Sequence, residues 1–220
     1  MSDINPKSGI AEYFEALFVA ILLALFIRSF IVQAFTIPSG SMLQTLQIGD
    51  YLLVNKFTYG IRLPLAVKET NPSGNSWWSR HSFVLGSEIV KMNDPQRGEI
   101  VVFEYPKDPS IHYIKRVVGL PGDTVEVRDK KLYVNGELQD EPYVQYVRSF
   151  PGPGDDFGPE VVPDGKYFCL GDNRDESYDS RFWGFVDRSA IVGKAFILYW
   201  SMDGISSIRW DRIGRSVHDL

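Results

Sequence analysis

The hydrophobic positions of this 220-residue chain fall into two patterns, a long apolar run near the N-terminus and short mixed runs after it. Residues 16–35 are almost continuously apolar, with Arg28 as their only charge. A helix of this length would be about 30 Å long at roughly 1.5 Å per residue, the thickness of the hydrocarbon core of a bilayer. The pattern predicts a polar tail over residues 1–12 and a membrane-spanning helix over residues 13–35.

A cleavable secretory signal is the alternative interpretation of the same apolar run. Residues 32–34, Val-Gln-Ala, have the small-residue spacing of a cleavage site. A signal peptide begins with a basic region, whereas residues 1–15 carry three acidic side chains and one lysine, and Arg28 lies between the apolar centre and the supposed cut. The flanks therefore favour an anchor, and a mature N-terminus at Phe35 would contradict it.

After residue 50 the pattern changes to short β-branched and aromatic runs separated by turn formers, which is typical of strands. The predicted strands are residues 51–57, 99–105, 111–118, 166–170 and 190–200, with two hairpin arms at residues 124–127 and 131–134. Residues 36–200 are therefore predicted to form a mainly β body, an antiparallel sheet with a hairpin insertion.

Three stretches lack this pattern. Residues 68–87 and 149–165 are rich in turn formers, which predicts an irregular excursion and a loop, and residues 201–220 are predicted to be an exposed tail with a tryptophan packed down. Within the first stretch, Trp77 and Trp78 suit either packing on the body or a membrane interface.

Composition excludes several classes of function. The net charge of -5 comes with no basic stripe, which argues against nucleic acid as a partner. Cys169 is the single cysteine, so no intrachain disulfide can form, and it is most simply a small buried apolar residue. Three scattered histidines offer no ligand spacing for a metal. We expect neither a metal nor any other cofactor.

The segment Phe35–Asp50, FTIPSGSMLQTLQIGD, places two serines around a glycine directly after the apolar run. Pro38 fixes one backbone angle and Gly40 permits conformations closed to other residues, so the segment should be a shaped turn that directs the Ser41 side chain. Ser41 is a candidate nucleophile. The alternative is a simple linker that leaves a membrane anchor.

A nucleophilic serine needs a base, and the strand at residues 111–118 offers two candidates. Strand alternation puts Lys115 on one face with Tyr113 and Val117, and His112 on the other. Only a neutral amine accepts a proton, and burial lowers a lysine pKa from about 10.4 toward 7 to 8, at a cost of roughly 3 to 4 kcal/mol. The alternative is that Lys115 lies on the exposed edge of an outer strand.

A third polar segment, residues 171–185 with the sequence GDNRDESYDSRFWGF, follows the strand at residues 166–170. Its density of Asp, Asn and Arg is typical of a hydrogen-bonded network in which Asp179 and Arg181 could pair. The spacing lacks the closing Glu of an EF-hand, which argues against a calcium site. The hydroxyl of Ser177 or Ser180 could face a reactive amine.

Taken together and in this order, IPSGSM, YIKRVVGLPGD and GDNRDESYDSRFWGF, behind one apolar segment, resemble the boxes of bacterial signal peptidase I, the membrane-bound serine-lysine leader peptidase family. The resemblance covers most of residues 13–200. It implies an endopeptidase that removes N-terminal signal peptides from exported preproteins. Gln44 departs from the pattern, because the family usually has proline there.

The resemblance also implies roles for individual residues. Ser41 would be the nucleophile and Lys115 the general base, Ser39 would donate to the oxyanion, and Ser177 would orient the Lys115 amine. Structural support of the site is implied for Asp179 and Arg181. The positions implied to line the shallow apolar substrate pockets are Ile37, Pro38, Met42, Leu46, Tyr113 and Ile114.

The implied location is the inner (cytoplasmic) membrane, crossed once, with the N-terminus in the cytoplasm and the catalytic domain on the outer (periplasmic or extracellular) face. The implied partners are signal peptides and the lipid bilayer, without nucleic acid or metal. Two alternatives stay open: a dedicated serine-lysine maturation protease, such as one acting on conjugation pili, and a non-catalytic membrane-anchored β module that binds a partner.

Overall fold

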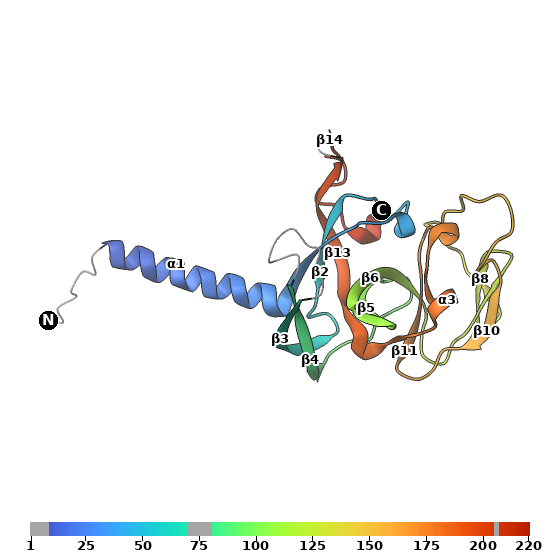
Figure 1. Ribbon diagram of the computed structural model, residues 1–220, viewed down its shortest axis with the longest axis horizontal. Helices are drawn as coiled ribbons and strands as arrows, with labels where there is room; N and C mark the ends of the chain where they lie inside the picture. The colour runs from blue at the N-terminus through green and yellow to red at the C-terminus, as the bar shows by residue number, and fades with distance from the viewer. Residues whose placement is uncertain (1–8, 70–80, 205–206) are drawn as a thin grey trace.

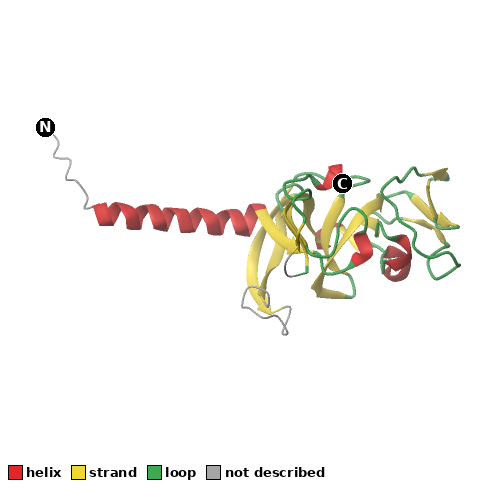
Figure 2. Cartoon of the chain, turned by 90° about the horizontal axis from the view of Figure 1, so that it is seen from above, coloured by secondary structure: helices red, strands yellow, loops and turns green. Residues whose placement is uncertain are grey.

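The computed structural model describes residues 9–69, 81–204 and 207–220. One long helix, α1 (Gly9–Phe26), projects away from a β body in Figure 1. The view from above in Figure 2 shows the same separation. The large apolar side chains of α1 point to solvent around the helix, and Phe14, for example, is 68% exposed. The helix therefore contributes nothing to the hydrophobic core of the body.

The helix begins and ends earlier than the sequence predicted. A π-helical turn, Ile27–Ile31, follows α1, and the chain then forms strand β1 (Val32–Thr36), which pairs antiparallel with β2 (Asp50–Asn55). The predicted helix is therefore wrong over residues 32–35, because β2 offers backbone partners that an isolated apolar run cannot reveal. Within the described ranges, no helix is both long and apolar enough to cross a membrane.

The body is mainly antiparallel β, which confirms the predicted class. Its largest sheet has eight strands in the order β1-β2-β13-β5-β6-β11-β12, with β14 paired to β13. The remaining strands of this sheet are β5 (Ile100–Tyr105), β6 (Asp108–Gly119), β11 (Lys166–Leu170), β12 (Val186–Asp187), β13 (Ile191–Asp203) and β14 (Ser207–Ile208).

Two smaller sheets complete the body, and both correct the sequence prediction. One has the order β10-β7-β8-β9, built from β7 (Thr124–Arg128), β8 (Lys131–Val134), β9 (Glu137–Leu138) and β10 (Phe157–Val161). β10 lies in a stretch predicted as loop, because its Gly and Pro mask a strand that pairing with β7 creates. The other sheet pairs β3 (Gly60–Glu69) with β4 (His81–Lys91), where an irregular excursion was expected. Trp77 and Trp78 lie outside the described residues.

Both faces of the large sheet are buried, which explains why its central strands are continuous apolar runs. In β5, Ile100 and Val102 belong to one hydrophobic cluster, with residues from β2 and β13. The alternate residues Val101 and Phe103 belong to a second cluster, which contains Val117 of β6. Alternation along neighbouring strands thus decides which cluster each side chain enters.

The C-terminal residues are part of the body and not the exposed tail that was predicted. Val217 is buried in the first cluster. Arg212 donates from Nη2 to the buried carboxylate of Asp50 at 2.7 Å and to the carbonyl of Thr45 at 2.8 Å. Trp210, which was predicted to be packed down, is instead 71% exposed, and its ring meets the Trp200 ring edge to face. This segment therefore holds the chain between Ser41 and β2.

Short helices lie between the strands and at the C-terminus. They are Gly40–Met42, Arg174–Glu176, α3 (Ser180–Trp183), Arg188–Ala190 and Val217–Asp219.

Candidate active site

The turn that carries Ser41 is fixed from both sides. The Ile37 backbone N–H donates to the carbonyl of Asp50 at 2.9 Å, which ties the start of the turn to β2. On the other side, Asn173 donates its backbone N–H to the Ser41 carbonyl at 3.2 Å and its Nδ2 to the Gly40 carbonyl at 3.1 Å. Ser41 is buried as a result. The glycine-containing turn and the third polar segment therefore act as one unit.

Strand β6 brings the amine of Lys115 to this turn. Its position opposite Val101 of β5 puts its side chain on the face of the second cluster, as alternation predicted. The Lys115 Nζ lies 2.6 Å from Ser41 Oγ in a hydrogen bond and donates to the Ile114 carbonyl at 3.0 Å. Lys115 is only 4% exposed. Among the residues that the structure describes, no carboxylate pairs with this amine.

The surroundings of the amine decide its protonation. Burial lowers the pKa of Lys115 to about 8, although the charge of Asp179 offsets part of that effect. An amine with this pKa is still mostly protonated at neutral pH, but its neutral fraction is far larger than that of an ordinary lysine, and the lone pair of the neutral form can accept the Ser41 proton. His112, the other candidate base, packs against the Phe35 ring on the opposite face of the strand. The pair capable of base-assisted nucleophilic chemistry is therefore Ser41 and Lys115.

The carboxylates nearest to the pair are bound by arginines. Arg116 donates from Nε to Asp172 Oδ1 at 2.9 Å and from Nη2 to Oδ2 at 2.6 Å, and Thr45 donates its hydroxyl to the same carboxylate at 2.6 Å. Asp179 pairs with Arg181 Nε at 2.8 Å, the ion pair that the sequence predicted. Sequence reasoning missed the Thr45–Asp172–Arg116 group, because its members come from three separate segments.

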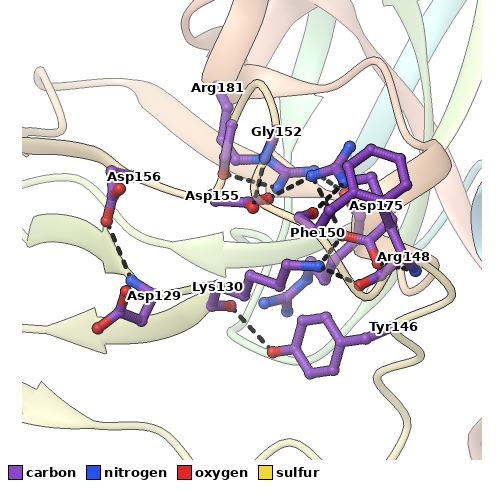
Figure 3. Close-up of polar contacts among 12 residues, drawn as sticks. Asp129, Lys130, Tyr146, Arg148, Phe150, Gly152, Asp155, Asp156, Asp175 and Arg181 are labelled. Atoms are coloured by element: carbon purple, nitrogen blue, oxygen red, sulfur yellow. Dashed lines mark hydrogen bonds and ion pairs between the residues drawn. The ribbon is translucent and has the colours of Figure 1, made fainter.

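The remaining aspartate of the polar segment, Asp175, binds the loop beside it (Figure 3). Lys130 Nζ donates to Asp175 Oδ1 at 2.8 Å, and the backbone N–H groups of Val147 and Arg148 each donate to Oδ2 at 2.8 Å. Burial by itself would raise the pKa of Asp175, but these hydrogen bonds hold it below its ordinary value. The network therefore ties the polar segment to Lys130 and to the loop that carries Val147 and Arg148.

Ser177 does not bond to Lys115 in this structure, and Ser39 lies at the exposed start of the serine turn. Ser177 is buried, but its Oγ has no hydrogen-bond partner among the described residues, so the bond that would orient Lys115 is not formed. Ser177 Oγ and the Ser41 carbonyl oxygen both lie close to Gly171, since a methyl group added to this glycine would be 2.2 Å from the first and 2.4 Å from the second. Ser177 is therefore beside the serine turn. Ser39 is exposed and makes no side-chain cap on the turn that follows it.

The residues expected to line substrate pockets divide into two groups. Met42 and Leu46 have no exposed surface, and Ile37 is buried with them in the first cluster, so these three shape the site from beneath. The other three are accessible: Pro38 is exposed, and Tyr113 and Ile114 are half-buried. In this structure only the second group can touch a substrate directly.

A β body that holds a serine hydroxyl against a buried amine has the arrangement of a serine hydrolase whose base is a lysine. Residues 10–200 match the model of the family described as signal peptidase, peptidase S26. The chain belongs to this family, and it is accordingly a serine endopeptidase.

Several individual signal peptidases are similar to this chain. Signal peptidase I of Pseudomonas aeruginosa is 39% identical over 235 residues, which cover 91% of this chain and 76% of the relative. A probable signal peptidase I-2 of Synechocystis is 36% identical, with 94% and 80% covered. A crystal structure of a signal peptidase I from Enterococcus faecalis is 38% identical and covers 47% of this chain and 98% of its own, with a TM-score of 0.42.

Proposed function

We propose that this chain removes N-terminal signal peptides from exported preproteins, with Ser41 as the nucleophile and Lys115 as the general base. The observation that carries the proposal is the 2.6 Å hydrogen bond between Ser41 Oγ and a Lys115 amine that has no carboxylate partner in the described part of the chain. A charged surface lysine could not serve as a base. This amine can, because burial brings its pKa to about 8.

The proposed reaction is an acyl transfer in two halves. Lys115 takes the Ser41 proton as Oγ attacks the scissile carbonyl, and the developing oxyanion accepts hydrogen bonds from the Ser41 backbone N–H and the Ser39 hydroxyl. As the carbon–nitrogen bond breaks, Lys115 gives its proton to the departing amine. Water activated by the same amine then releases the signal peptide from Ser41. Asp179 and Arg181 would keep the supporting segment in place.

The remaining site residues have proposed roles that fit their positions. Pro38, Tyr113 and Ile114 would contact the residues ahead of the cut, and the buried Met42 would set the shape beneath them. Ser177 would orient the Lys115 amine once substrate has closed the site, since its buried hydroxyl has no other partner among the described residues.

We further propose that the segment up to residue 35 anchors the enzyme in the cytoplasmic membrane, with the N-terminus in the cytoplasm and the body on the outer face. The apolar side chains of α1 are exposed all around the helix, which is unfavourable in water and favourable in lipid. Anchoring would hold the body beside signal peptides in the same bilayer and raise their effective concentration.

The test is incubation of the detergent-solubilised protein with a preprotein, followed by mass spectrometry of the new N-terminus. We expect one cut at the signal-peptide junction, and none with Ser41→Ala or Lys115→Ala. A binding module would retain the preprotein without cutting it, and its retention would be the same in both variants. A panel of unrelated preproteins separates a general peptidase, which cuts most of them, from a maturation protease with one substrate.

A further inference from the structure

Asn173 holds the serine turn through two different groups. Its side-chain Nδ2 donates to the Gly40 carbonyl at 3.1 Å, and its backbone N–H donates to the Ser41 carbonyl at 3.2 Å. These carbonyls belong to the peptide units directly before and directly after the Cα atom of Ser41. Because one residue holds both units, the backbone torsions of Ser41 cannot change without breaking one of these hydrogen bonds.

The peptide unit between Gly40 and Ser41 contains the proposed oxyanion donor, the Ser41 N–H. This unit is trans, so its carbonyl and its N–H point in opposite directions. A donor on the Gly40 carbonyl therefore also fixes the direction of the Ser41 N–H on the other side. A hydrogen bond to an amide carbonyl polarises the unit as well, which makes its N–H a stronger donor.

The backbone on either side of Asn173 is held by Gln145. The Gln145 N–H donates to the Asp172 carbonyl at 2.9 Å, and the Arg174 N–H donates to the Gln145 carbonyl at 3.1 Å. Asn173 itself has no exposed surface. Its amide is therefore a fixed group, and the turn that it contacts is fixed with it.

The fold itself depends little on the Asn173 amide. Nδ2 faces two acceptors, the Gly40 carbonyl and, at 3.2 Å, the carboxylate of the exposed Glu176, so the nitrogen occupies this position. The buried Oδ1 has no partner among the described residues. The Gly40 carbonyl also accepts from the Leu43 N–H at 3.2 Å and would keep that partner without Nδ2. Loss of the amide should therefore destabilise the protein little.

We propose that Asn173 is a positioning residue for the oxyanion site, whose Nδ2 holds the Gly40–Ser41 peptide unit so that the Ser41 N–H points at the oxygen of the scissile carbonyl. This inference rests on the proposed peptidase function and assigns the residue that aligns its backbone donor. Removal of an oxyanion donor typically lowers kcat by about 10²- to 10³-fold. A donor that is present but no longer aligned should lose less, and we expect kcat to fall about tenfold.

Asn173→Leu tests this role, because leucine has nearly the shape of asparagine but no donor. With a preprotein peptide, kcat should fall about tenfold while KM and the midpoint of the pH profile stay unchanged, since substrate contacts and Lys115 are untouched. The urea midpoint should also stay unchanged. Asn173→Ala removes the same donor without the bulk and should give the same kcat. Glu176→Ala removes the other acceptor of Nδ2 and should keep the wild-type kcat.

A peptide aldehyde that ends at the residue before the cut reports on the oxyanion site directly. Ser41 Oγ forms a bond to the aldehyde carbon, the π electrons of the carbonyl move to its oxygen, and Lys115 takes the serine proton. The adduct therefore places a negative oxygen in the oxyanion site without cleaving a bond. Asn173→Leu should raise the inhibition constant of the aldehyde about tenfold and leave that of the matching peptide alcohol, which forms no adduct, unchanged.

Wild-type kcat in the folded Asn173 variants would overturn the role of Asn173 while leaving the peptidase intact. Equal weakening of the aldehyde and the alcohol would also overturn it, because the loss would then lie in substrate binding. A fall in kcat that follows a fall in the urea midpoint would show a structural role only. Failure of the wild-type protein to cut the peptide would overturn the proposed function itself.

Discussion

Two lysines, the partly exposed Lys130 and the buried Lys115, show how the same side chain is given different surroundings in one molecule. Lys130, 20% exposed in its side chain, donates to the Asp175 carboxylate at 2.8 Å and to the Arg148 carbonyl at 2.8 Å. Lys115 is buried against apolar residues, and its nearest polar partners are a hydroxyl and a carbonyl, neither of which carries a charge. Lys130 therefore has a structural ion pair, whereas burial lowers the pKa of Lys115 and no adjacent carboxylate offsets that effect, so this amine can act as a base.

The polar segment after β11 produces this difference. It carries three aspartates, and each binds a cation other than Lys115: Asp172 binds Arg116, Asp175 binds Lys130 and Asp179 binds Arg181. The arginines are better partners for carboxylates because their fork matches two oxygens at once. The segment thus supports the site and still leaves the Lys115 amine without a carboxylate partner in the described part of the chain.

The largest expected effect comes from making the Lys115 charge permanent. Lys115→Arg should lower the rate of preprotein cleavage by at least about 10⁴-fold, because a guanidinium does not deprotonate and the loss of one member of a catalytic unit removes most of its contribution. Initial rates with purified protein measure it. Lys131→Arg, on the exposed neighbour of Lys130, should leave the rate unchanged. Substantial cleavage by Lys115→Arg would contradict the lysine-base mechanism.

The pH profile tests the same contrast without a mutation. Because only the neutral amine acts as a base, kcat/KM should rise about tenfold per pH unit in acid and level off above the Lys115 pKa of about 8. Stopped assays from about pH 5 to 10 measure this. Burial lowers the pKa of His112, and His112→Gln should leave the profile unchanged. A midpoint that moves with His112→Gln would assign the titration to the histidine.

Removing the counter-ion from Lys130 should affect stability and not chemistry. Asp175→Asn leaves two mostly buried cations facing a neutral amide, and we expect the free energy of unfolding to fall by about 2 to 3 kcal/mol. Urea denaturation followed by tryptophan fluorescence measures it, with the exposed Asp164→Asn as control. Since the folded-state pKa of Asp175 is lowered, its contribution is lost as the pH falls through that value, and the two proteins should converge in acid.

The smallest expected effect comes from giving Lys115 a counter-ion. Cys169 is fully buried and close enough to the Lys115 amine to interact with it electrostatically. Cys169→Asp should raise the Lys115 pKa, shift the pH profile upward by about one unit and lower the rate at neutral pH about tenfold. Cys169→Asn has the same shape without the charge, so its profile should stay in place. Equal shifts in both variants would show that packing, not charge, controls the amine.

The sequence predicted the parts of the fold that depend on local pattern. Strand β5 and the second half of β6 were predicted correctly because their residues are buried on both faces, which produces unbroken runs of β-branched and aromatic residues. The sequence-based prediction failed where pairing with a distant segment decides the structure. Strand β1 forms because it pairs with β2, and strand β10 forms because it pairs with β7. Arg212 was predicted to be part of an exposed tail because its partner, Asp50, lies 162 residues away in the sequence.

For the site, the sequence by itself determined which groups are available: a serine on a shaped turn, a lysine on an apolar strand face and a segment dense in aspartate and arginine. Only the tertiary structure decided that the amine and the hydroxyl, 74 residues apart, lie 2.6 Å from each other, and that every nearby aspartate binds a different cation. The physical reason is that a pKa depends on desolvation and on charges a few ångströms away, and neither follows from the order of residues along the chain.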